Sequence, residues 1–237
     1  MLEQLQKELN DLRNPEQAKN LQRFFKTGAG EYAEGDIFLG IKVPVSRQLA
    51  KKYSHLNFQE IQQLLNSKIH EHRLIALLIL IEKYKKSKKN RLEQRKIFEL
   101  YLKNTKNINN WDLVDLSAPQ ILGDFLQKEG TDLLINLAQS KNLWERRIAI
   151  ISTYSFIKKR RFGETLEISE ILLNDTHDLI HKAVGWMLRE VGKRNKPMLD
   201  LFLMQRYHKM PRVMLRYAIE KFPEDERKRW LKKKSGD

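Results

Sequence analysis

The sequence contains no cysteine among its 237 residues. It therefore cannot form a disulfide bond, and it has no thiolate to act as a nucleophile or to ligate zinc or an iron–sulfur cluster. Catalysis, if there is any, must use carboxylates, histidines, hydroxyls or amines. The absence fits the reducing cytosol, so we expect a cytoplasmic protein, associated with the nucleoid if its host is a prokaryote.

Glycine and proline are scarce as well, with 10 and 6 residues. Few segments alternate with the period of two that marks a strand, whereas Leu, Lys, Glu, Arg, Ile and Gln favour helix. The sequence predicts an all-α protein with one glycine-rich loop at 27–40. The candidate helices are 2–12, 15–26, 44–53, 58–66, 70–86, 90–103, 111–127, 131–139, 143–159, 164–173, 177–193, 197–206, 211–221 and 224–233.

Long hydrophobic runs are missing too. The longest, LIALLILI at 74–81, is far too short to cross a bilayer and predicts the buried side of a core helix. The N-terminal MLEQLQKELNDLR is polar and amphipathic, unlike a signal peptide. We therefore expect no membrane partner.

Acidic residues are outnumbered, 30 against 45 Lys and Arg, which gives a net charge of +15 and a pI near 9.8. This excess attracts polyanions, and charge alone ranks nucleic acid first as a partner class and an anionic membrane surface second. The basic residues recur in clusters that suit a phosphate backbone, although a solvated surface has the same composition. The clusters are KYKKSKKNR at 83–91, KKRR at 158–161, GKRNK at 192–196 and RKRWLKKK at 227–234.

Four apolar segments resemble one another, each with a small residue inside a helix. They are HEHRLIALLIL at 70–80, LWERRIAIIST at 143–153, DLIHKAVGWML at 178–188 and PRVMLRYAIEKF at 211–222. Ala149, Ala183 and Ala218 are 34 and 35 residues apart, and Ala76 precedes them by nearly two units. This period predicts a HEAT-like α-solenoid with a concave basic groove, against the alternative of a non-repetitive helical bundle. We expect one domain over 1–237, with N-terminal helices to about 55 and a basic tail from about 224.

One stretch, NINNWDLVDLSAPQIL at 107–122, combines an apolar helix with charged residues. Asp112 suits a first helical turn, where acids favour the helix dipole. Asp115 lies a turn further in, four residues after Trp111, so the indole and the carboxylate project from one face. Pro119 follows and removes a backbone donor, which predicts a disturbed helix there.

Several weaker motifs are set aside. GAGEYAEG follows no strand, and Glu31, Glu34 and Asp36 would repel a phosphate. HDLIH at 177–181 has histidine spacing suited to zinc but lacks the glutamate of a zinc protease, and HEH at 70–72 spreads its histidines around a helix. We expect no metal and no cofactor.

Together, several segments resemble the AlkD-type DNA alkylation-repair glycosylases over roughly residues 15–222. The segments that carry the resemblance are IFLGIKVPVSR at 37–47, WDLVD at 111–115, LGDF at 122–125, LWERRIAI at 143–150 and KAVGWMLRE at 182–190. The resemblance implies a HEAT-like fold and removal of positively charged alkylpurines, such as 3-methyladenine and 7-methylguanine, from duplex DNA. We expect a monomer, since a groove that wraps duplex DNA needs no second copy.

The resemblance also implies site residues. The catalytic carboxylate falls on Asp115, and the residues that would contact substrate or DNA are Trp111, Trp186, Arg147, Arg189 and Asp112. A further N-terminal aromatic falls on Phe24 or Phe25, which the sequence does not distinguish.

Two other functions stay open at this point. The chain could be a non-catalytic DNA- or RNA-binding repeat protein that recognises distorted or branched nucleic acid, or a protein-interaction scaffold. In either case Asp115 and Arg147 could form a plain interhelical ion pair, with Trp111 and Trp186 as core residues.

Overall fold

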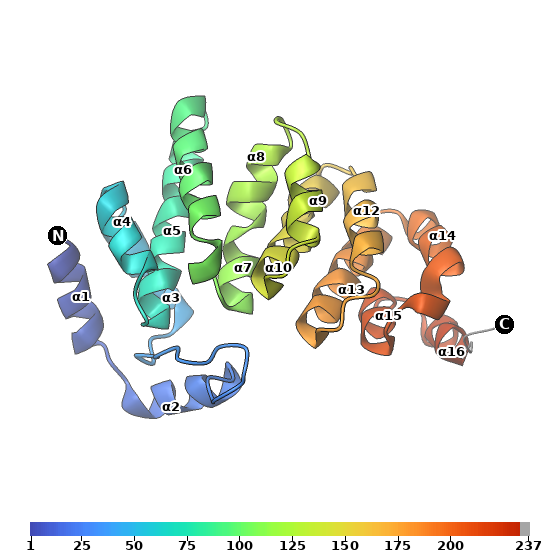
Figure 1. The fold of residues 1–237 in the computed structure, drawn as a ribbon, viewed down its shortest axis with the longest axis horizontal. Helices are drawn as coiled ribbons and strands as arrows, with labels where there is room; N and C mark the ends of the chain where they lie inside the picture. The colour runs from blue at the N-terminus through green and yellow to red at the C-terminus, as the bar shows by residue number, and fades with distance from the viewer. Residues whose placement is uncertain (233–237) are drawn as a thin grey trace. The chain divides into compact units, whose positions relative to one another are not determined.

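A computed structural model describes residues 1–232 and shows an all-α fold (Figure 1). Over these residues the only extended pairing is an isolated parallel bridge between Ile37 and Ile69, so no strand forms. The expected fold class is confirmed. No helix among the described residues is long and apolar enough to span a membrane. The contacts divide the chain into two compact units, Met1–Ser117 and the part that begins at Ala118.

Unit 1 is built around one helix that is buried on nearly all sides, α5 (His70–Lys86). The helices α3 (Val43–Lys52), α4 (Phe58–Leu65), α6 (Arg91–Lys103) and α7 (Trp111–Ser117) pack on it. Two more, α1 (Leu2–Asp11) and α2 (Pro15–Phe24), precede them, and a 3₁₀ turn spans Thr105–Asn107. The apolar run at 74–81 lies inside α5, as expected from its composition.

Unit 2 begins with a π-helix, Pro119–Gly123, and α8 (Asp124–Leu126). Next come α9 (Asp132–Ala138), α10 (Leu143–Ser152), α11 (Tyr154–Lys158), α12 (Gly163–Ile171) and α13 (Asp178–Gly192). The unit continues with α14 (Lys196–Arg206), a 3₁₀ turn at Tyr207–Lys209, α15 (Arg212–Ala218) and α16 (Glu224–Lys232). The basic tail expected from about 224 is helical to Lys232, and residues 233–237 lie outside the described part.

The internal repeat is visible in unit 2. Helix α9 packs on α10 and α12 on α13, while α10 packs on α13 and α13 on α15, so pairs stack on pairs. The buried alanines of the repeat, Ala149, Ala183 and Ala218, lie on α10, α13 and α15. Stacked helix pairs of this kind are what the spacing of 34 and 35 residues predicts. The expected curved groove stays a prediction.

Hydrogen bonds between successive repeats of unit 2 have the same period as the sequence repeat. The Arg160 guanidinium donates to the carbonyl of Arg194 at 3.4 Å, and that of Arg161 to the carbonyl of Gln127 at 3.1 Å. Both pairs are 34 residues apart. Equivalent loops of neighbouring repeats therefore lie side by side in unit 2.

Two expected helices are interrupted. The helix expected over 111–127 ends at Ser117, and a π turn follows in which the amide of Gly123 donates to the carbonyl of Ala118 at 2.9 Å. The disturbance expected at Pro119 is confirmed. The helix expected over 143–159 breaks at Thr153, whose hydroxyl donates to the carbonyl of Ile150 at 2.7 Å and competes with the helical bonds.

Candidate functional site

Three of the expected site residues, Trp111, Asp112 and Asp115, lie on α7 in unit 1. The Asn110 side chain accepts a bond from the Trp111 amide at 2.8 Å and so caps the start of this helix. Trp111 and Asp115 are four residues apart and both are half-buried. The indole and the carboxylate thus share one helix face and remain accessible from solvent.

The Trp111 ring packs against the C-terminal end of α2. It stacks on Phe25 with ring centroids 5.1 Å apart and an interplanar angle of 21°, and it meets the edge of Phe24 at 5.9 Å. Phe25 is buried against Ala18 and Phe38, whereas 64% of Phe24 is exposed. The two neighbours therefore differ in role: Phe25 is core, and Phe24 is the aromatic ring presented to solvent beside Trp111.

The Asp115 carboxylate lies near the buried side chain of Tyr101. The Tyr101 side chain is fully buried, and its hydroxyl bonds to the Ser117 hydroxyl at 3.0 Å. Burial raises the pKa of Tyr101, and the negative charge of Asp115 raises it further. The carboxylate of Asp115 is therefore close enough to Tyr101 for its charge to act on this buried side chain.

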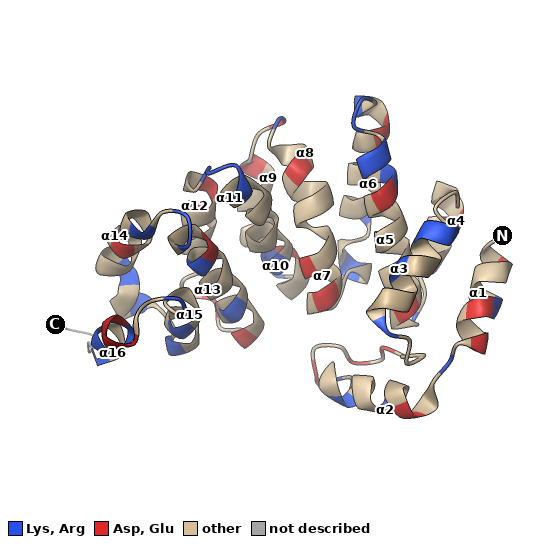
Figure 2. Ribbon diagram, turned by 180° about the vertical axis from the view of Figure 1, so that it is seen from behind, with Lys and Arg blue, Asp and Glu red and all other residues tan. Residues whose placement is uncertain are grey.

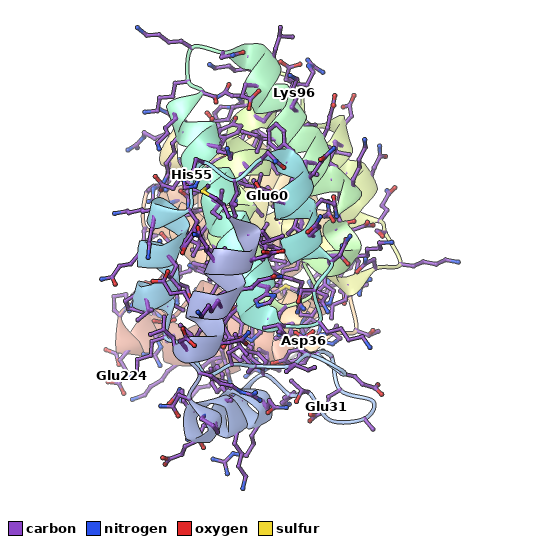
Figure 3. The ribbon with its side chains drawn as sticks, turned by 90° about the vertical axis from the view of Figure 1, so that its left-hand side faces the viewer. Glu31, Asp36, His55, Glu60, Lys96 and Glu224 are labelled. Atoms are coloured by element: carbon purple, nitrogen blue, oxygen red, sulfur yellow. The ribbon has the colours of Figure 1, made fainter. Side chains whose placement is uncertain are left out.

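Asp112 is held by a histidine. Its Oδ2 lies 2.8 Å from Nε2 of His70, the first residue of α5. The Nδ1 of the same ring is 3.4 Å from Asp36, which also accepts a bond from Arg73 at 2.7 Å. Figure 3 shows Asp36 where the 25–42 segment meets the rest of unit 1. The expected DNA contact of Asp112 stays a prediction, and its pairing with His70 was not foreseen.

The glycine-rich loop satisfies its own amides. The Glu31 carboxylate accepts from the amide of Gly28 at 2.9 Å, and the Glu34 carboxylate from that of Gly30 at 3.0 Å. Acidic side chains thus occupy the donors that a phosphate loop would offer to its ligand. The loop therefore offers a phosphate neither these two amides nor a positive charge at Glu31 and Glu34.

The remaining expected residues lie in unit 2. Arg147, on α10, is buried, and its guanidinium donates to the carbonyl of Leu179 in α13 at 2.5 Å. Trp186 and Arg189 are half-buried on α13. Arg189 is paired with the Glu220 carboxylate. The expected proximity of Arg147 to Asp115 stays a prediction.

Tyr154, which sequence reasoning missed, lies beside Trp186, with ring centroids 6.4 Å apart. Two cations flank its ring: Lys158 Nζ at 4.7 Å from the centroid and Arg194 Cζ at 5.9 Å. These cations come from the basic clusters at 158–161 and 192–196, which Figure 2 shows on the loops after α11 and α13. The four-residue spacing of Tyr154 and Lys158 is the signal that could have identified the pair.

The histidines of HDLIH have local structural partners. Nδ1 of His177 accepts from the Leu179 amide at 3.1 Å and caps α13, while Nε2 of His181 lies 2.5 Å from the carbonyl of Asp175. Burial lowers the pKa of His177. In residues 1–232, no group of three or more histidines and carboxylates is arranged to hold a metal ion.

Comparison with known proteins gives the family. The family model described as DNA alkylation repair enzyme matches residues 5–222. No curated protein matches the sequence. Among solved structures, a predicted DNA alkylation repair enzyme from Enterococcus faecalis is similar at a TM-score of 0.67 and 19% identity, over 90% of this chain and 97% of the other.

Two structures from Streptococcus mutans are also similar. AlkD2 matches at a TM-score of 0.55 and 17% identity, over 88% of this chain and 99% of the other. The smu.31 structure matches at a TM-score of 0.55 and 16% identity, over 88% of this chain and 100% of the other. At such identities the structures support the fold, whereas the family model spans nearly the whole sequence. The chain belongs to the family of DNA alkylation repair enzymes.

Proposed function

We propose that the protein is a monofunctional DNA glycosylase that removes positively charged alkylpurines, such as 3-methyladenine and 7-methylguanine, from duplex DNA. One observation carries the proposal: in a member of an alkylation repair family, a solvent-accessible Asp115 lies one helical turn from the Trp111 indole. No cofactor or metal takes part in the proposed reaction.

The reaction needs little from the protein because the leaving group is already cationic. The bond between C1′ and the purine nitrogen breaks, and its electron pair neutralises the base. The sugar becomes an oxocarbenium ion that water attacks at C1′, with loss of one proton. The Asp115 carboxylate stabilises the developing positive charge and orients the water, as one carboxylate does in glycoside hydrolysis.

The aromatic rings supply a second stabilising surface. Indole faces attract cations by about 0.5–2 kcal/mol, depending on desolvation. Trp111 is fixed against Phe25 and presents its remaining surface beside the exposed Phe24. We propose Trp111 and Phe24 as contacts to the sugar and backbone around the lesion, with no capture of the base in a pocket.

Unit 2 supplies the proposed contacts to the DNA backbone. Trp186 and Tyr154 offer ring faces, and Lys158 and Arg194 offer cations beside them. Arg147 and Arg189 are proposed as further DNA contacts. Phosphate contacts of this kind give an affinity that falls steeply with salt, whereas a protein-interaction scaffold would bind DNA weakly and without such a slope.

The test is release of 7-methylguanine from methylated duplex DNA by the purified protein. We expect Asp115→Asn to slow release by about 10²–10³-fold while DNA binding persists. Asp132→Asn, the same change at an exposed acid on α9, should retain activity. Borohydride should trap no covalent adduct, because the mechanism uses no amine nucleophile. Release by Asp115→Asn at the wild-type rate contradicts the proposal.

The second candidate is a non-catalytic protein that binds distorted or branched nucleic acid. The cations gathered around Tyr154 favour it, since a stacking surface flanked by positive charge suits any nucleic-acid backbone. Salt-dependent binding of branched DNA by a wild-type protein that releases no base would support this second function.

A further inference from the structure

His70 is buried between two carboxylates. Only 2% of the residue is exposed, and its two ring nitrogens lie 2.8 Å from Asp112 Oδ2 and 3.4 Å from Asp36 Oδ2. An ionised carboxylate accepts hydrogen bonds and cannot donate them. Both nitrogens of the ring must therefore carry a hydrogen, which makes the ring an imidazolium.

The surrounding charges agree with this protonation state. Burial alone would lower the pKa of His70, but the carboxylates of Asp112 and Asp36 outweigh it and raise the pKa to about 9. Arg73 opposes that rise by its own positive charge and is paired with Asp36 at 2.7 Å. The two cations, His70 and Arg73, thus balance the two carboxylates, Asp36 and Asp112, in one cluster. Glu71, the residue after His70, lies outside this balance because its carboxylate accepts bonds from backbone amides of residues 39–41.

The cluster connects three segments of unit 1. Asp36 belongs to the chain between α2 and α3, His70 begins α5, and Asp112 lies in the first turn of α7. The rings add a second connection: His70 stacks on Phe38 at 4.4 Å, Phe38 stacks on Phe25, and Phe25 stacks on Trp111. Each connection ends on α7, the helix that carries Asp115.

Asp112 depends on this partner. Its second carboxylate oxygen, Oδ1, is buried and finds no hydrogen-bond partner among residues 1–232. The Asp112 side chain is 18% exposed, so loss of its cation leaves a mostly buried charge uncompensated, which is unfavourable. The first turn of α7 is therefore placed by the imidazolium rather than by Asp112 alone.

We propose that His70 is a positioning residue, whose ion pair with Asp112 orients the first turn of α7 and so fixes Trp111 and Asp115 for base release. The inference rests on the glycosylase function proposed above. His70 does not contact the reacting atoms and acts through Asp112. Displacement of a catalytic group by about 1 Å can cost on the order of a hundredfold in rate.

The test compares His70→Gln with His72→Gln in single-turnover base release. His72 is buried on the same helix but bonds to the Ser67 hydroxyl at 3.0 Å, away from α7, so its variant is the matched control. We expect His70→Gln to lower the rate constant about 10- to 100-fold, as loss of an orienting partner does. DNA affinity should stay within about twofold, because phosphate contacts supply it.

A second variant separates positioning from general damage. Adding Asp112→Asn to His70→Gln replaces the unpaired charge by a neutral amide pair, so the double variant should recover part of the lost rate. A wild-type rate for His70→Gln, an equal loss in His72→Gln, or fully additive losses in the double variant would each overturn the positioning role.

A third measurement does not depend on activity. Nitrogen-15 NMR of the histidine rings should show both nitrogens of His70 protonated at pH 7.5. The folded pKa of about 9 lies above the unfolded value of 6.5, so this group stabilises the fold fully below 6.5 and the contribution is lost as pH rises through 9. Urea unfolding from pH 6 to 9.5 should show that loss in wild-type protein and not in His70→Gln.

The outcomes distinguish the two proposals. A neutral His70 at pH 7.5 overturns the positioning role even if the wild-type protein releases base. A protonated His70 in a wild-type protein that releases no base refutes the glycosylase function, and the positioning role with it.

Discussion

Glu71 provides the sharpest test of how the N-terminal segment is held. Only 1% of this residue is exposed, and its carboxylate accepts three backbone bonds: from Leu39 at 2.9 Å, Gly40 at 2.8 Å and Ile41 at 3.1 Å. The bonded segment leads from α2 to α3 and lies against the N-terminus of α5. Glu71→Gln keeps the shape of the side chain and removes its charge, so it isolates the contribution of the carboxylate.

The expected loss follows from the three bonds. A hydrogen bond to a charged group contributes about 1.5–3 kcal/mol and a neutral one about 0.5–1.5 kcal/mol. Glutamine keeps one acceptor oxygen for Gly40 and Ile41, while its amide nitrogen meets the Leu39 N–H donor to donor. Burying an amide costs less than burying a carboxylate, which offsets part of the loss. We therefore expect the free energy of unfolding to fall by about 2–4 kcal/mol.

The assay is urea unfolding, with hydrogen exchange at the amides of Leu39, Gly40 and Ile41. For a chain of this size the loss corresponds to a fall in Tm of roughly 5–15 °C. The control is Glu82→Gln, a partly exposed acid of α5 that pairs with Lys85 at 3.5 Å, which should change stability by less than about 0.5 kcal/mol. If Glu71→Gln matches that control, or if exchange at the three amides is unchanged, the carboxylate does not hold this segment.

Three further predictions concern the proposed site. Asp115→Asn should slow base release by about 10²–10³-fold, the cost of removing one pre-aligned electrostatic group, in single-turnover kinetics. Phe25→Ala should lower the unfolding free energy by about 3–5 kcal/mol because it leaves a cavity under Trp111, whereas Phe24→Ala should cost under about 1 kcal/mol and mainly slow base release. Equal destabilisation by both changes would contradict the assignment of Phe24 to the surface. Lys158→Ala and Arg194→Ala should each reduce the salt slope of DNA affinity by about one, and an unchanged slope would remove the loops around Tyr154 from the DNA contact.

The helices were predictable because their signals are local. The boundaries of α2, α4 and α5 agree with the expected ranges within about two residues, since Asn14 and Asn57 cap α2 and α4 by contacts to amides two or three residues away. The repeat was predictable because small residues recur at a fixed spacing in the sequence, and the helices that carry them, α10, α13 and α15, stack on one another. The break at Thr153 was missed because the apolar residues keep their helical spacing on both sides of it.

In the candidate site, the sequence by itself determined that Trp111 and Asp115 share a helix face, because a four-residue spacing fixes that once the helix forms. It also determined the basic loops and the family pattern. Only the tertiary structure decided which of Phe24 and Phe25 is exposed, and that His70 binds Asp112 and Asp36. The two contacts of His70 join residues 34 and 42 positions apart. Such contacts, like the exposure of one phenylalanine and not the other, depend on how distant segments pack, which no local pattern encodes.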